Sequence, residues 1–128
     1  MIRIEECSGS TLAYIGDAVW SLLVRTYLVE KGYTRAKDLQ MRSVNFVSAK
    51  AQATFYQRLE TETFFDDKEK EIFRRGRNFK SDSVPKNTDV VTYRISTGFE
   101  ALVGFWQLTE NQQRLKQAWD KIRTWMEE

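Results

Sequence analysis

Apolar residues recur every three or four positions along most of the chain, the spacing of one buried face on an α-helix. Long segments with this period, together with a single proline and only six glycines, predict an all-α domain. The first helix is expected from about Ser10 to Lys31, with Gly32 as its stop. Its expected buried residues are Leu12, Ile15, Val19, Leu22 and Leu23.

The same pattern predicts the rest of a helical bundle. The expected helices are a short one capped by Thr34 and ending near Met41, one from Ser43 to Leu59, one starting near Phe65 or Asp66, one over about 88–108 capped by Thr88 or Asp89, and a last one carrying Leu115, Trp119, Ile122 and Trp125 or Met126. Segment 81–89 holds the only proline and several capping residues, so a loop is expected there. Without an internal repeat or linker, residues 1–128 are predicted to form a single domain. Trp20, Trp119 and Trp125 are expected in the core.

Charge is distributed unevenly along the chain. The net charge is +2, but residues 70–86 carry +4 and the remainder therefore −2. This local excess is typical of a phosphate-binding surface, although a solvated helix end would carry the same cations. The candidate nucleic-acid contacts are Arg74, Arg75, Arg77, Asn78, Lys80 and Lys86.

Features of secreted or membrane proteins are missing from the sequence. The single cysteine, Cys7, can form neither an internal disulfide nor a zinc cluster, which favours a reducing compartment. The longest apolar stretch, Ala18 to Val24, is interrupted by Ser21 and is shorter than a membrane span, and the N-terminus lacks a signal-peptide core. We therefore expect a cytoplasmic protein that does not bind membranes.

Two acidic residues, Asp17 and Glu100, lie inside apolar helical runs. Gly16 precedes the first, and Gly104 follows the second by four positions, so two helices that crossed at these glycines would bring both carboxylates together. Taken alone, an acid in such a run is more often an exposed side chain on a polar stripe, whereas the occurrence of two in the two most apolar helices favours a shared site as much as that alternative. Because the chain has no histidine, carboxylates are the natural catalytic groups, and a hard, oxygen-binding cation is the natural cofactor.

These motifs resemble those of a known family. Leu12-Ala-Tyr-Ile-Gly-Asp-Ala-Val-Trp20 resembles the signature helix of the ribonuclease III family, and Phe99-Glu-Ala-Leu-Val-Gly104 resembles its second acidic motif. Phe46-Val-Ser-Ala-Lys-Ala-Gln52, Arg74-Arg-Gly-Arg-Asn78 and Val84-Pro-Lys-Asn-Thr-Asp89 are similar to the short bacterial branch, Mini-ribonuclease III. That branch has the catalytic domain and no separate double-stranded-RNA-binding domain.

The resemblance implies a magnesium-dependent endoribonuclease that cuts double-stranded RNA, with Mn²⁺ as an expected substitute for Mg²⁺. Asp17 and Glu100 would hold the metal, and the products would carry 5′-phosphate and 3′-hydroxyl ends. The implied substrate class is precursor large-subunit (23S) ribosomal RNA. The implied assembly is a homodimer in which Tyr14 of the signature helix inserts into the partner.

The chain also departs from the longer members of the family. Ala13 and Thr97 stand where those enzymes have two further acids, which leaves two carboxylates per site. Magnesium keeps several water ligands, so two carboxylates are enough to hold it. Two alternatives remain open, namely a non-catalytic module on the same fold that binds double-stranded RNA or the ribosome, and a helical dimerisation scaffold that binds no nucleic acid.

Overall fold

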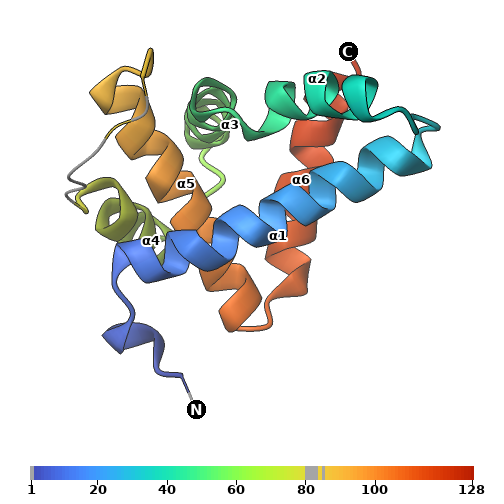
Figure 1. Cartoon of the computed structure of the whole chain (residues 1–128). Coiled ribbons are helices and arrows are strands. Elements are labelled where there is room, and N and C mark those ends of the chain that lie inside the picture. Colours follow the sequence, from blue (N-terminus) through green and yellow to red (C-terminus); the bar gives the residue numbers. More distant parts are fainter. Residues whose placement is uncertain (1, 80–83, 85) are drawn as a thin grey trace.

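The computed structural model describes residues 2–79, 84 and 86–128, and within these ranges the chain is helical, without a β-strand (Figure 1). The all-α fold predicted from the sequence is confirmed. The helices are η1 (Ile4–Glu6), α1 (Gly9–Glu30), α2 (Ala36–Val47), α3 (Ala49–Thr61), α4 (Asp67–Arg77), α5 (Val90–Leu108) and α6 (Gln112–Met126).

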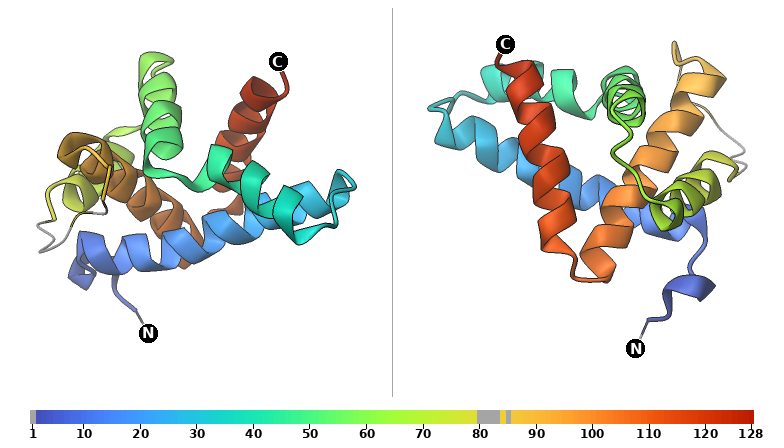
Figure 2. Two further views of the ribbon diagram at one scale, coloured as in Figure 1. Left: turned by 45° about the horizontal axis from the view of Figure 1, so that its top comes forward. Right: turned by 180° about the vertical axis from the view of Figure 1, so that it is seen from behind.

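Helices α1 and α5 cross at the centre of the bundle, and the other helices pack around this crossing (Figures 1 and 2). Helices α3 and α4 lie against α5, α2 lies along the C-terminal half of α1, and α6 turns back from the end of α5 so that the two helices diverge as a V. By length and composition α1 would also suit a membrane span, but here it packs against α2, α4 and α5. Its position is that of a core helix.

The crossing is close because a glycine lies on each helix at the contact point. A Cβ atom on Gly16 would lie 1.7 Å from the carbonyl oxygen of Glu100, and one on Gly104 would lie 1.9 Å from the carbonyl oxygen of Leu12. Any side chain larger than hydrogen would therefore push the two backbones apart. The helix crossing predicted from the sequence is confirmed.

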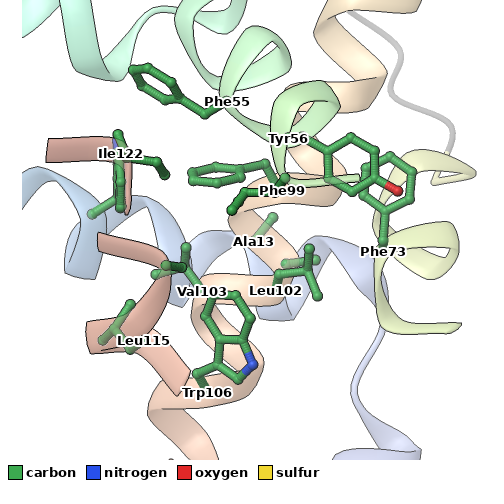
Figure 3. Close-up of a cluster of buried hydrophobic side chains, with 14 of the residues drawn as sticks. Ala13, Phe55, Tyr56, Phe73, Phe99, Leu102, Val103, Trp106, Leu115 and Ile122 are labelled. Atoms are coloured by element: carbon green, nitrogen blue, oxygen red, sulfur yellow. The ribbon is translucent and has the colours of Figure 1, made fainter. Parts of the chain in front are cut away.

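The core is rich in aromatic side chains contributed by different helices (Figure 3). Figure 3 shows the ring of Tyr56 of α3 against that of Phe73 of α4. The two rings stack with their centroids 3.7 Å apart. The indole of Trp20 packs edge-on against Phe99, and its Nε1 donates a hydrogen bond of 2.8 Å to the Phe46 carbonyl. As predicted, Trp20 is buried, whereas Trp119 and Trp125 are only partly buried at the edge of the core.

Two features of the helices differ from the sequence prediction. The break that was expected at Ser43 lies at Ser48, whose Oγ caps α3 by accepting a hydrogen bond from the Ala51 amide. The preceding helix is capped at Arg35 rather than Thr34, and without a side-chain hydrogen bond. The periodicity continues across this break, so the apolar pattern alone does not locate it.

The buried face of α1 is also different from the predicted one. Leu22 is 68% exposed, and the other predicted residues except Leu12 are only partly buried. The helix buries Gly9, Leu12, Ala13, Gly16, Trp20, Val24 and Leu28. The crossing at Gly16 determines how α1 is rotated about its own axis, and therefore which face is buried. A second stripe of apolar residues is left facing solvent. We call the exposed residues Tyr14, Ala18, Leu22 and Val29 the α1 stripe.

Candidate active site

The α1–α5 crossing brings the two acidic side chains together. Asp17 follows the glycine that contacts the Glu100 carbonyl, and both carboxyl groups line one cavity of about 430 Å³ between the helices. They lie within hydrogen-bonding reach of each other. Asp17 is exposed and Glu100 is partly buried. The crossing thus places Asp17, although it lies in an apolar run, on the open side of the cavity, with Glu100 deeper inside.

The electrostatics of the pair are dominated by Glu100. Burial, followed by the hydrogen bond and the negative charge of Asp17, raises the pKa of Glu100 to about 9. A hydrogen bond from the Gln52 side chain acts in the opposite direction but is weaker. Two carboxylates held this close disfavour each other's ionised form, and a cation between them would reverse that preference.

The ligand atoms fit a hard divalent cation. The cavity offers carboxylate and hydroxyl oxygens, and the described part of the chain contains no group of three or more His, Cys, Asp or Glu side chains that could hold a metal. Ala13 and Thr97 line the same cavity, and the Thr97 hydroxyl donates to the Tyr93 carbonyl at 3.0 Å. The protein thus supplies two carboxylates, a number that suits Mg²⁺ with several bound waters.

Two further side chains at this site were missed in the sequence analysis. Gln52 of α3 is buried, and its Nε2 donates to Glu100 Oε2 at 3.3 Å. Among the described residues that line the cavity, Arg94 is the only cation. Arg94 could have been noticed, since it precedes Thr97 by three positions on the same helix, and residues so spaced are neighbours on a helix surface. Gln52 ends the Phe46–Gln52 motif that resembles the Mini-ribonuclease III branch, but the motif does not indicate its hydrogen-bond partner, which lies 48 residues away.

Arg94 also lines a second hollow of about 340 Å³ between α3, α4 and α5. Arg77 and Asn78, at the C-terminal end of α4, also line this hollow. Arg94 therefore borders both the carboxylate cavity and a hollow lined by part of the basic segment.

The predicted nucleic-acid contacts differ in their accessibility. Arg74, Asn78 and Lys86 are exposed, whereas Arg77 is partly buried with its guanidinium over the Phe73 ring. Lys80 lies outside the described residues.

Arg75 differs from the other predicted contacts because its guanidinium is engaged inside the protein. Nη1 donates to the carbonyls of Ile4 and Cys7 at 3.0 and 3.1 Å, and Nη2 pairs with Glu71 at 2.9 Å. Arg75 thus ties the N-terminal segment to α4. Its contact with RNA stays a prediction.

Comparison with known proteins places this site in context. The family model described as Ribonuclease III domain matches residues 10–111. The chain is 46% identical over 116 residues to the Mini-ribonuclease 3 of Streptococcus pneumoniae, covering 91% of each protein. It is 45% identical over 122 residues to the Mini-ribonuclease 3 of Staphylococcus aureus, covering 95% of this chain and 91% of the relative. A crystal structure of a Fusobacterium nucleatum protein shares the fold with a TM-score of 0.84 at 28% identity, over 93% of this chain and 95% of the other.

Proposed function

Because the chain belongs to the ribonuclease III family, within its Mini-ribonuclease 3 branch, and is therefore an endoribonuclease, we propose that it cuts double-stranded RNA at the Asp17–Glu100 cavity with a divalent cation as cofactor. The observation that carries the proposal is the pair of carboxylates that two crossing helices bring to one cavity. We propose Mg²⁺ as the physiological ion and Mn²⁺ as a working substitute, because all available ligand atoms are oxygens.

Each functional side chain of the cavity has a distinct role in the proposed reaction. When bound, the cation supplies an activated water and offsets the negative charge that develops on the phosphorus. Asp17 and Glu100 would hold the cation, and their positions on two packed helices fix the two carboxyl groups relative to each other. Arg94 lies on the same wall and offers a cation to a non-bridging phosphate oxygen.

We propose that RNA binds across the basic segment as well as the cavity. The exposed Arg74, Asn78 and Lys86, with Lys80 by its sequence position, would contact phosphates and 2′-hydroxyls, since double-stranded RNA is recognised mostly by shape and backbone. Arg77 would contribute from the wall of the second hollow.

The assembly we propose is a two-fold homodimer formed through the α1 stripe. Tyr14 is 79% exposed, and Leu22 and Val29 are 68% and 52% exposed on the same side of α1. A row of large exposed apolar side chains on one helix is typical of a protein interface. Tyr14 also lines the carboxylate cavity, so the two sites of the dimer would lie beside the interface.

The finer details of the proposal rest on the resemblance of the motifs. We propose that the substrate is precursor 23S ribosomal RNA in the cytoplasm and that the products carry 5′-phosphate and 3′-hydroxyl ends. End-group analysis of the cut strands tests the product chemistry.

The decisive experiment compares wild type with Asp17→Asn and Glu100→Gln on a duplex RNA in Mg²⁺ and in EDTA. Both substitutions conserve size and remove a charge, so each should abolish cleavage while RNA binding in EDTA is retained. Asp67→Asn is the matched control, because Asp67 is an exposed acid of α4 and should leave the rate unchanged. Binding without any cutting by wild type would instead favour the non-catalytic module. If wild type neither binds nor cuts the duplex, the helical dimerisation scaffold that binds no nucleic acid is favoured.

A second experiment tests the RNA-binding surface. Replacing Arg74 and Lys86 together by alanine should weaken duplex binding and flatten the dependence of log K on log salt by roughly 0.9 per lost phosphate contact, a slope established for B-DNA. The affinity is measured at several salt concentrations for one duplex. If the double variant and wild type show equal affinity and equal salt dependence, Arg74 and Lys86 do not contact the RNA. Arg75→Ala is less informative, since it also releases the N-terminal segment.

A further inference from the structure

Gln52 is a buried amide whose side-chain donor is directed at the active site. It is 2% exposed, and its Nε2 donates to Glu100 Oε2 at 3.3 Å, joining α3 to α5. An amide removed from water is unfavourable unless it forms hydrogen bonds, and an apolar side chain of the same size would fill this space without that penalty. The hydrogen bond to Glu100 is therefore the physical reason for an amide at this place in the core.

The local structure holds Gln52 in this position. Ser48 caps α3, its carbonyl accepts the Gln52 backbone N–H at 3.0 Å, and the side chain of Gln52 leaves from the first turn of the helix. The break between α2 and α3 thus sets the direction from which the amide approaches α5. Phe55 and Tyr56 of the same helix are buried and anchor it in the core.

The chemistry of the donor suits a residue that supports a cation ligand. An amide N–H fixes the direction of a carboxylate without bringing a positive charge, so it does not compete electrostatically with a cation bound by Glu100. A lysine or arginine at position 52 would compete with that cation. The hydrogen bond occupies one oxygen of Glu100, and the carboxyl group is held in reach of Asp17.

We infer that Gln52 is a positioning residue of the active site, which orients the Glu100 carboxylate toward Asp17 for cation binding. The inference rests on the proposed function, since it assumes that Asp17 and Glu100 bind the ion. Partners of this kind are worth about 10- to 100-fold in metal affinity in well-studied metalloproteins. Removing the amide should therefore weaken cation binding by a factor in this range.

The test is calorimetric titration of the RNA-free protein with Mn²⁺, on wild type, Gln52→Met and Gln52→Leu. Both substitutions replace the amide by an apolar side chain of similar size, so the fold should be kept, which urea unfolding verifies. The expected result is a 10- to 100-fold weaker Mn²⁺ affinity for both variants, with RNA affinity in EDTA unchanged. Gln113→Met is the control, because Gln113 is exposed on α6 and should bind Mn²⁺ like wild type.

The outcomes separate this inference from the proposed function. Equal Mn²⁺ affinity of wild type and of either folded Gln52 variant overturns the positioning role and leaves the function intact. If Asp17→Asn and Glu100→Gln also bind Mn²⁺ like wild type, the carboxylates are not the ligands, and the proposed function itself fails. A second readout is the Mg²⁺ concentration at half-maximal cleavage, which should rise in the Gln52 variants while the rate at saturating Mg²⁺ changes less.

Discussion

The raised pKa of Glu100 predicts that the metal-free protein becomes less stable as the pH rises. The pKa is about 9 in the folded protein, against 4.5 for an ordinary glutamate, because of burial and the neighbouring Asp17. Between these values the folded protein retains a proton that the unfolded chain has released. Stability is therefore greatest below the unfolded pKa and is lost progressively as the pH approaches the folded pKa.

The size of the effect follows from the two pKa values. Within this window the unfolded state has lost one proton more than the folded state, so each pH unit changes the free energy of unfolding by about 1.4 kcal/mol. Between about pH 5 and about pH 7 the wild type should lose about 2–3 kcal/mol through Glu100 alone. Such a loss is a large fraction of the stability of a typical small domain, which is about 5–15 kcal/mol.

The assay is urea unfolding in EDTA at several pH values, for wild type and Glu100→Gln. Glutamine cannot titrate, so the difference between the two pH profiles isolates Glu100 together with its coupling to Asp17. The free energy of unfolding of the variant, relative to that of wild type, should rise by about 2–3 kcal/mol between about pH 5 and about pH 7. A difference in unfolding free energy that stays constant with pH would refute the reasoning. Excess Mg²⁺ should remove the slope from the wild type, because cation binding favours the ionised carboxylate.

Three further perturbations test the architecture around the site. Gly16→Ala places a Cβ 1.7 Å from the Glu100 carbonyl oxygen, so calorimetry should show a loss of about 1–3 kcal/mol or more, and cleavage should fall because the carboxylates move apart. Arg114→Met leaves Glu69, which is 2% exposed, without its ion-pair partner, and urea unfolding should report a loss of about 3–5 kcal/mol while Mn²⁺ affinity is unchanged. Tyr14→Arg puts a charge on the α1 stripe and should shift sedimentation from dimer to monomer, whereas a wild type that is already monomeric at micromolar concentration would contradict the dimer.

Glu69 has two roles in the fold, of which the sequence predicts one and only the tertiary structure shows the other. Asp66 and Glu69 form a capping box at the start of α4, and the spacing of an acid before this helix was visible in the sequence. The carboxylate of Glu69 also accepts hydrogen bonds from Arg114 and from Trp106 Nε1, at 2.6 and 2.9 Å. Burial alone would raise the pKa of Glu69, but Arg114, the Asp66 backbone amide and Trp106 together lower it. The capping box forms between neighbours in sequence, whereas the contacts of Glu69 with Arg114 and Trp106 depend on helices that are distant in sequence.

The sequence by itself determined the features that depend on neighbours along the chain. Helical periodicity, the stop at Gly32 and the caps at Asp66 and Asp89 are short-range, so their patterns are readable. The candidate carboxylates were also readable, because Gly16 lies beside one acid and Gly104 one helical turn after the other. A close helix crossing needs small residues at the contact, and these two glycines can be recognised in the sequence.

Only the tertiary structure decided which side chains meet at the site and which are used elsewhere. The hydrogen bond from Gln52 to Glu100, the position of Arg94 in the cavity wall and the use of Arg75 to hold the N-terminal segment all depend on contacts between separate helices. The exposure of Asp17 depends on how α1 is rotated at the crossing. Such contacts arise from the packing of whole helices, and the spacing of residues within one helix does not encode them.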